Sequence, residues 1–251
     1  MAIENGDFVR LNFTGKIKET DEIFDTTFQD VADEAGILVE DKVYGPIPIV
    51  VGGGHLLKAI EESIIGTDVG DDVHVSVTPE NGFGQRDSSL VQLIPMKEFK
   101  KQGINPVRGM KITSDGGNGK IISVNGGRVK VDFNHDLAGK NLEYDVSVVE
   151  VIDNDEDKVK SMIELHYSYP NMDVDKTEVS IDGDTIKIKL DEITRFDQQS
   201  YMDVTFARFR ISKDIWDNMG YEKVQFVDEF EKRVEEDSED VVEEVPEEAE
   251  E

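Results

Sequence analysis

The chain has 251 residues, no cysteine, and 56 acidic against 27 basic side chains, which gives a formal charge of −29. The absence of cysteine excludes a disulfide scaffold, a thiolate zinc site and a cysteine nucleophile. A strongly negative surface repels phosphates and anionic lipids, so we expect neither nucleic acid nor membrane as a partner. The N-terminus lacks the pattern of a signal peptide, and no apolar run approaches the roughly 20 residues that span a bilayer. We therefore expect a soluble cytoplasmic protein.

The acidic charge is concentrated at the C-terminus. Eleven acidic residues and no basic one follow Val234, which leaves −18 of the total charge of −29 for residues 1–233. A segment with so much like charge and so few large apolar groups cannot offset its ordering entropy by burial, so residues 234–251 are predicted to be disordered. A solubilising tail is favoured over a specific docking tail.

The N-terminal part alternates between apolar and polar residues, a pattern that is typical of strands. The predicted strands are Asp7–Ile17, Glu22–Asp25, Ile49–Val51 and Asp71–Thr78. A triple glycine precedes a predicted amphipathic helix, His55–Ile65, whereas residues 30–43 are a polar connection with little periodicity. The first 84 residues are therefore predicted to form a mostly antiparallel sheet around one short helix.

The middle of the chain consists of extended runs joined by glycine-rich turns. The predicted strands are Leu90–Ile94, Met110–Thr113, Lys120–Val124 and Arg128–Phe133. They indicate a small separate β unit, because turn signals such as Asn125-Gly126-Gly127 join neighbouring strands. The segment Leu142–Val151 then alternates once more, as though it completed the first sheet.

Residues 155–228 form a third region with mixed periodicity. Its predicted elements are a helix at Lys158–Tyr167, a hairpin at Thr177–Leu190, a long helix at about Ser200–Met219 and a strand at Lys223–Val227. The long helix carries an apolar stripe made of Met202, Phe206, Phe209, Ile215 and Trp216. Such a stripe favours core packing over a ligand site.

Several kinds of chemistry have no support in the sequence. The triple glycine is followed by His55 rather than by the Lys-Ser/Thr pair of a nucleotide loop. The four histidines are scattered without an i,i+4 pair, so no metal site is predicted. No Gly-x-Ser-x-Gly elbow occurs, and the carboxylates are too numerous to single out a glycosidase pair.

A set of short motifs occurs in a fixed order along the chain. They are Val9-Arg10-Leu11-Asn12-Phe13-Thr14-Gly15, Phe24-Asp25-Thr26-Thr27, Val51-Gly52, Leu56-Leu57-Lys58-Ala59-Ile60-Glu61, Val69-Gly70-Asp71, Pro79-Glu80-Asn81-Gly82-Phe83-Gly84 and Leu142-Glu143-Tyr144-Asp145-Val146. The set resembles the FKBP-type peptidyl-prolyl cis-trans isomerases. Two further motifs, in residues 87–92 and 131–139, make it similar to the SlyD-like branch, in which an insert-in-flap chaperone domain interrupts the isomerase domain. The layout after residue 155 resembles the long archaeal FKBPs.

The resemblance implies an α+β fold: an antiparallel FKBP half-barrel around a short helix, with an inserted small β domain and a C-terminal α+β domain. The expected parts are a discontinuous isomerase domain (1–86 and 137–152), the insert (87–136), the C-terminal domain (155–230) and the acidic tail (234–251). The resemblance also implies a homodimer through the C-terminal domain. The long apolar helix itself leaves open a dimer interface or a private core.

The resemblance also implies a proline-binding pocket that needs no cofactor and no metal. The residues implied in catalysis are Phe24, Asp25, Phe83 and Tyr144. Those implied in substrate binding are Phe13, Ile47, Leu56, Leu57, Ile60 and Leu142. Phe13 and Phe83 replace the tyrosines common in the family, and Ile60 replaces the usual tryptophan, so we expect modest activity on short peptides and weak binding of macrolide inhibitors. For Phe13 and Ile60, a role in the plain core stays open.

The insert has more apolar side chains than a unit of about 50 residues can bury. An exposed apolar groove for unfolded chains is expected from Val91, Leu93, Ile94, Met96, Phe99, Val107 and Met110. The expected partners are therefore unfolded or proline-containing polypeptides. The alternative is a holdase or adaptor that binds peptides without catalysis. A third hypothesis, metal delivery as in His-rich relatives, lacks the histidine-rich tail that it needs.

Overall fold

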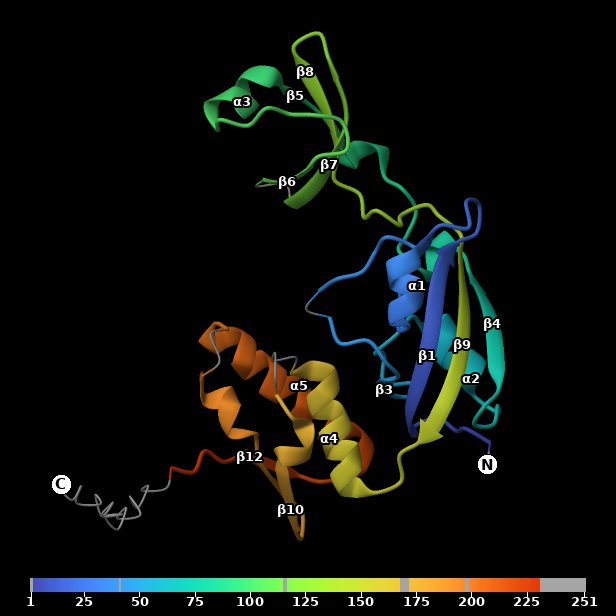
Figure 1. Cartoon of the computed structure of the whole chain (residues 1–251), viewed down its shortest axis with the longest axis vertical. Coiled ribbons are helices and arrows are strands. Elements are labelled where there is room, and N and C mark those ends of the chain that lie inside the picture. Colours follow the sequence, from blue (N-terminus) through green and yellow to red (C-terminus); the bar gives the residue numbers. More distant parts are fainter. Residues whose placement is uncertain (1, 41, 115–116, 168–171, 197–198, 231–251) are drawn as a thin grey trace, which may run out of the picture.

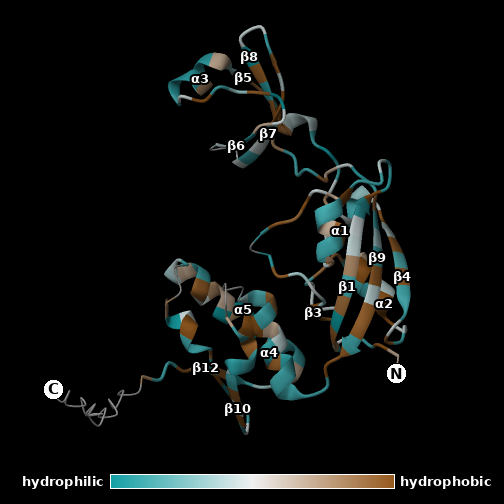
Figure 2. Ribbon diagram, in the orientation of Figure 1, coloured by the Kyte–Doolittle hydropathy of each residue, from teal (hydrophilic) through white to brown (hydrophobic). Residues whose placement is uncertain are grey.

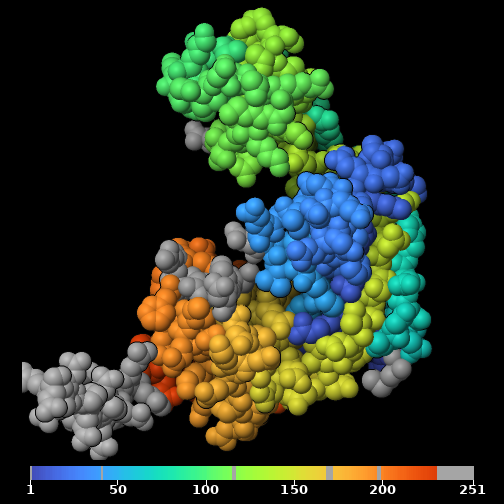
Figure 3. Space-filling model, viewed as in Figure 1, coloured from blue at the N-terminus to red at the C-terminus, as the bar shows by residue number. Residues whose placement is uncertain are grey.

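The computed structural model describes residues 2–40, 42–114, 117–167, 172–196 and 199–230. The segment predicted to be disordered, 234–251, lies outside these residues. We call residues 2–86 and 137–152 the N-terminal domain, 87–136 the insert and 155–230 the C-terminal domain. Figure 3 shows the insert projecting from one end of the N-terminal domain, with the C-terminal domain packed against another side. The predicted α+β class with antiparallel sheets is confirmed.

Strand β1 organises the N-terminal domain. Its main sheet has the order β2-β1-β9-β4, and β3 also pairs with β1, each pair being antiparallel. The strands are β1 (Phe8–Ile17), β2 (Ile23–Thr26), β3 (Ile47–Val50), β4 (Asp72–Val77) and β9 (Leu142–Val151). Because β9 follows the insert yet pairs with β1 along its length, the returning chain completes the first sheet. Figure 2 shows hydrophobic and hydrophilic residues alternating along these strands.

Two helices belong to this domain. Helix α2 (Lys58–Ile64) buries Ile60, Glu61 and Ile64 and begins three residues later than predicted. Helix α1 (Gln29–Glu34) replaces part of the expected irregular connection at 30–43. Only Ala32 of α1 is buried, which explains why the segment has no apolar periodicity to reveal the helix.

The insert has a sheet and a small core of its own. The strands β5 (Val91–Pro95), β6 (Lys111–Ser114), β7 (Gly117–Asn125) and β8 (Arg128–Asp132) pair in the order β5-β8-β7-β6. The short helix α3 (Met96–Lys101), which was not predicted, buries Phe99 against Ile121, Val129 and Val131. The two chain segments that lead to the insert are joined where the Asp87 N–H donates to Asn134 Oδ1 at 2.8 Å and Arg86 pairs with Asp132.

The C-terminal domain consists of two helices and a small sheet. Its elements are α4 (Asp155–His166), β10 (Glu178–Asp182), β11 (Thr185–Lys189), α5 (Tyr201–Met219) and β12 (Lys223–Phe226). The side chain of Asn154 caps α4, and that of Ser200 caps α5. Strand β12 pairs with β11 in parallel, which is possible because α5 provides the crossover between them. Short 3₁₀ turns occur at Pro79–Asn81, Ser88–Leu90, Val174–Lys176 and Glu192–Phe196.

One apolar cluster is shared by the N-terminal and C-terminal domains, and it is separate from the core inside the N-terminal domain. Phe8 and Val50 of the N-terminal domain are buried in the same cluster as Met162 and Ile163 of α4. At the edge of this cluster, Arg10 binds Glu164 of α4 at 2.6 Å and Glu150 at 3.1 Å. The two domains therefore pack against each other, and Figure 1 shows α4 on the side of the N-terminal domain where β3 lies.

The expectation that the stripe on the long helix is core is wrong for four of its five residues. Met202, Phe206, Phe209 and Trp216 are 40–56% exposed, and only Ile215 is buried. Helix α5 instead packs through Ala207, Ile211 and Ile215, which recur every four residues. The helix thus has a second apolar face, which points to solvent. Among the described residues, no helix combines the length and the apolar character that crossing a bilayer requires.

Candidate active site

The residues expected to form the pocket lie together on the inner side of the main sheet. Phe13 comes from β1, Leu142 and Tyr144 from β9, and Ile60 from α2, and these four side chains are buried. The remaining apolar members are half-buried and pack against the same cluster: Phe24, Ile47, Leu56, Leu57 and Phe83. The structure therefore brings these segments, which are far apart in sequence, into one apolar site.

Aromatic rings give this site its shape. The ring of Tyr144 lies edge-on to Phe24 at 5.6 Å and is tilted against Phe13 at 6.1 Å between centroids. Gly15 makes this arrangement possible, because a Cβ there would lie 2.7 Å from Phe24 Cζ and 2.8 Å from Tyr144 Cε1. The glycine of the first motif thus gives two rings room to lie across β1.

The phenol of Tyr144 is held in its neutral form. Burial, helped by the negative charge of Asp25, raises the pKa of Tyr144 from 10.0 to about 12. The hydroxyl therefore keeps its proton throughout the neutral range. It can act as a hydrogen-bond donor but not as a base.

Asp25 lies at the edge of the site and is partly exposed. Its Oδ1 accepts a hydrogen bond from the Thr26 N–H at 2.9 Å and forms an ion pair with Lys42 Nζ at 2.8 Å. The ammonium of Lys42 also lies over the ring of Tyr44, 5.2 Å from its centroid. Lys42 was not among the expected site residues, because it belongs to the irregular connection at 30–43 and reaches Asp25 only through the fold.

Buried threonines fix the backbone next to this carboxylate. The Phe13 N–H donates to Thr27 Oγ1 at 3.0 Å, and the hydroxyls of Thr14 and Thr26 are 2.9 Å apart. Thr27 in turn donates to Asn12 Oδ1 at 2.8 Å. These bonds hold β2 to β1, so that Phe24 and Asp25 keep a fixed position relative to Phe13.

The loop before α2 contributes a backbone donor. The Leu57 N–H lies at the start of α2 and donates to no group in the part of the chain that the structure describes. The loop is held by the buried carboxylate of Glu61, which accepts the N–H groups of Gly54 at 3.1 Å and Leu56 at 2.8 Å. A substrate carbonyl can therefore bind to Leu57, in the position that the family resemblance implies.

One further ring was not among the expected site residues. His135 stacks on Phe83 with 4.3 Å between centroids and an interplanar angle of 2°. A hollow of about 680 Å³ between β6, β7 and residues 133–136 is lined by Ile112, Phe133 and His135. His135 thus connects the surface of the insert with the candidate pocket. His135 belongs to the motif in residues 131–139, but the motif alone does not indicate which ring it contacts.

The residues expected to form a groove on the insert differ in their exposure. Leu93 and Val107 are 60% and 56% exposed, whereas Val91, Ile94, Met96 and Met110 are half-buried. Phe99 is only 5% exposed and belongs to the core of the insert, which corrects its assignment to an exposed groove. A small unit needs a large side chain at its centre, and α3 supplies Phe99.

Comparisons with known proteins agree with this geometry. Residues 1–100 match the family model described as FKBP-type peptidyl-prolyl cis-trans isomerase, 92–137 match "FKBP26, IF domain", and 155–231 match "FKBP26 C-terminal". A short-type peptidyl-prolyl cis-trans isomerase of Methanocaldococcus jannaschii is 39% identical over 150 residues, covering 59% of this chain and 94% of that protein. SlyD, an FKBP-type peptidyl-prolyl cis-trans isomerase of Escherichia coli strain K12, is 33% identical over 135 residues, 51% of this chain and 68% of that protein.

The pKa of Tyr144 predicts how stability depends on pH. The unfolded phenol ionises near pH 10 and the folded one near 12, so the folded state binds more protons between these values and stability falls as pH rises through them. When the pH is raised from 9 to 11.5, we expect the free energy of unfolding to fall less in Tyr144→Phe than in the parent, and the difference between the two falls to be at most about 2 kcal/mol. Urea unfolding, followed by circular dichroism at pH 9 and at pH 11.5, measures both falls. Equal losses in the two proteins would contradict the expectation.

Proposed function

This chain belongs to the FKBP-type peptidyl-prolyl cis-trans isomerases, and we propose that it accelerates X-Pro isomerisation in folding proteins at the pocket around Tyr144. Rotation about this bond has a barrier of about 18–20 kcal/mol, because amide resonance must be broken. The twisted transition state has less charge separation than the planar imide, so an apolar site favours it over the ground state. The observation that carries the proposal is the convergence of Phe13, Phe24, Ile60 and Tyr144 in one cluster.

Within this pocket each group has a proposed role. Phe24, Phe83 and Tyr144 contact the proline ring and exclude water, together with Phe13, Ile47, Leu56, Ile60 and Leu142. The Leu57 N–H donates to a substrate carbonyl and so fixes one side of the rotating bond. Asp25 places a carboxylate at the rim, and Lys42, 2.8 Å away, holds this carboxylate in place.

We expect Asp25→Ala and Phe24→Ala each to lower kcat/KM by about tenfold, equivalent to about 1.4 kcal/mol of transition-state stabilisation. The assay is NMR exchange between the cis and trans forms of an Ala-Leu-Pro-Phe peptide. Asp145→Ala is the matched control, because Asp145 follows Tyr144 on β9 but is exposed and bonded to His74 at 2.7 Å. Unchanged exchange in both test variants would contradict the assignment, and absence of exchange in the parent would favour a holdase.

We further propose that the insert binds unfolded chains and delivers them to the pocket. The exposed side chains of Leu93 and Val107 and the half-buried Met96 and Met110 offer apolar, adaptable surface. Client segments held there have a high effective concentration at the isomerase site, because the two units are joined in one chain. The stack of His135 on Phe83 supports this arrangement, since it puts a residue of the insert against a pocket residue.

Deletion of Asp87–Asp136 is expected to reduce proline-limited refolding of a protein substrate strongly while sparing isomerisation of a tetrapeptide. The double variant Leu93→Ser/Val107→Ser tests the same point with the insert fold intact, because both side chains are more than half exposed. Lys97→Ser/Lys130→Ser is its matched control, since it changes two exposed polar residues of the insert. Equal losses in the protein and tetrapeptide assays would contradict the division of labour.

We also propose that two copies associate through the exposed face of α5. The aromatic side chains of Phe206, Phe209 and Trp216 lie on this face, and the rings of Phe209 and Trp216 are 6.3 Å apart. Unlike the chain as a whole, α5 has three basic and three acidic side chains, so charge repulsion does not oppose self-association at this helix. A cytoplasmic location stays a prediction.

Light scattering after size exclusion is expected to give twice the chain mass of 28.2 kDa for the parent. Phe206→Glu/Phe209→Glu is expected to give a single chain, because two charges cannot be buried in an apolar interface. Val43→Glu is the control, since Val43 is an exposed apolar residue of the N-terminal domain. A monomeric parent, or a double variant that is still dimeric, would contradict this interface.

A further inference from the structure

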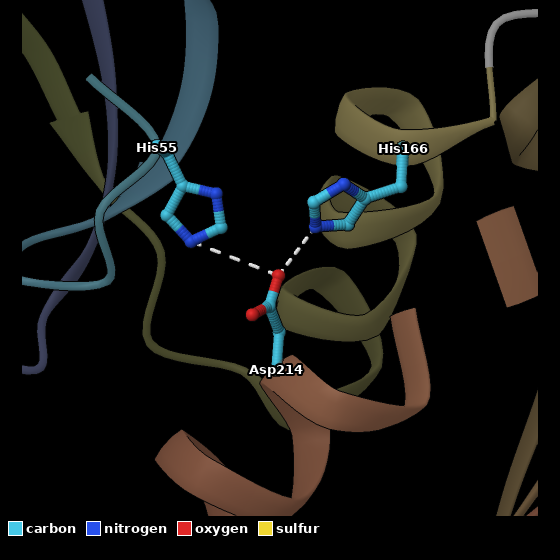
Figure 4. A group of neighbouring side chains, drawn as sticks. All are labelled: His55, His166 and Asp214. Atoms are coloured by element: carbon cyan, nitrogen blue, oxygen red, sulfur yellow. Dashed lines mark hydrogen bonds and ion pairs between the residues drawn. The ribbon is translucent and has the colours of Figure 1, made fainter. Parts of the chain in front are cut away.

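Three side chains converge where the N-terminal and C-terminal domains meet: His55, His166 and Asp214 (Figure 4). His55 Nε2 lies 3.6 Å from Asp214 Oδ2, and His166 Nε2 is hydrogen-bonded to the same oxygen. One potential ligand atom from each residue lies within 4.8 Å of the others. The isomerase chemistry proposed above uses none of the three.

Each of these residues is held from a different element. His55 belongs to the loop before α2, whose N–H groups at Gly54 and Leu56 are bound by the buried carboxylate of Glu61. Gly53 gives the imidazole its room, because a Cβ there would lie 2.5 Å from His55 Nε2. His166 is the last residue of α4, and Asp214 lies on the buried side of α5. The two helices pack against each other, so His166 and Asp214 are already close before His55 joins them.

The ring nitrogen of His55 has no hydrogen bond to compensate its burial. The side chain is 5% exposed, and its Nε2 has no hydrogen-bond partner among the residues that the structure describes. A buried polar atom without a partner costs free energy, so its direction toward Asp214 and His166 calls for an explanation. Burial lowers the pKa of His55 below 6.5, although the negative charge of Asp214 opposes this effect. Imidazole nitrogen is a common ligand of metal ions, so a cation between the three groups would give this nitrogen the partner that it lacks.

We propose that His55 Nε2, His166 Nε2 and the carboxylate of Asp214 bind one Zn²⁺ ion that joins the two domains. Zinc binds imidazole nitrogen at about 2.0–2.1 Å and carboxylate oxygen at about 2.0–2.2 Å, in tetrahedral geometry. Ligand atoms around such an ion are separated by about 3.3–3.5 Å, close to the 3.6 Å between His55 and Asp214. The ion takes the place of the hydrogen that lies between His166 Nε2 and Asp214, and the imidazole of His166 carries its remaining hydrogen on Nδ1, which it reaches by exchange with solvent. A water molecule completes the four ligands.

The position of the site gives the ion a structural role. His55 directly precedes Leu56 and Leu57 in the loop at the pocket, whereas both other ligands belong to the C-terminal domain. Zinc therefore adds a bond between the pocket loop and the C-terminal domain, beside the apolar core that the two domains share. Two imidazole nitrogens beside one carboxylate distinguish this site from the many exposed carboxylates of the chain, which offer only oxygen ligands.

The test uses the full-length chain, free of affinity tags and treated with a chelator. Titration with Zn²⁺ by calorimetry is expected to give one strong site per chain. His166→Ala and Asp214→Asn are each expected to weaken it more than about 100-fold, because losing a group that merely orients a ligand already costs about 10–100-fold. His74→Ala is the matched control, since His74 is bonded to an exposed carboxylate in the N-terminal domain.

Co²⁺ distinguishes this site from surface carboxylates even if a variant fails to fold. In the parent it is expected to give the intense visible absorption of tetrahedral Co²⁺ and to quench Trp216, which lies two positions after Asp214 and is the single tryptophan of the chain. Added Zn²⁺ should reverse both signals. Weak octahedral absorption, unquenched tryptophan, or equal affinity in the parent and the two ligand variants would overturn the proposal.

Discussion

The two faces of strand β1 determine how the rest of the molecule is arranged. Val9, Leu11 and Phe13 point into the core that contains the pocket. Phe8 and Arg10, on the opposite face, contact the C-terminal domain through the shared core and through Glu164 of α4. Because successive side chains of a strand point to opposite sides, one strand serves both domains. A shift of its register by one residue would move both sets of contacts to the wrong face.

Strand β9 places the insert at the rim of the pocket. Its pairing with β1, from Ile17 with Leu142 to Val9 with Val151, requires the chain to return to the sheet after the excursion through residues 87–136. The two ends of the insert therefore lie side by side. The side chain of Asn134 joins them, because it accepts a hydrogen bond from the N–H of Asp87 and donates one to the carbonyl of the same residue. The same strand supplies Leu142 and Tyr144, so the residues that end the insert and those that form the pocket are only a few positions apart.

Much of the fold could be predicted because the strands have clear periodicity and the motifs lie at fixed distances along the chain. The short helices α1 and α3 have no periodic pattern, because each buries a single side chain, Ala32 or Phe99. The stripe on α5 is periodic, yet four of its five residues are exposed, because the helix packs through Ala207, Ile211 and Ile215. Periodicity shows that residues share a face of a helix, but only the packing of other elements decides which face is buried.

Contacts between distant segments explain what could not be predicted in the sites. Lys42 reaches Asp25, His135 stacks on Phe83, and His55 meets His166 only because the fold brings these segments together. The scattered histidines predict no metal site, because no two of them have the i,i+4 spacing that places ligands on one face of a helix. A site between domains needs no such spacing, because each ligand can be held by its own element.

Glu61 connects the pocket with the contact between the domains. Its buried carboxylate orders the loop that carries both Leu57, at the pocket, and His55, at the C-terminal domain. The contact between His55 and Asp214 of the C-terminal domain therefore involves the same loop whose next two residues, Leu56 and Leu57, pack against the pocket cluster.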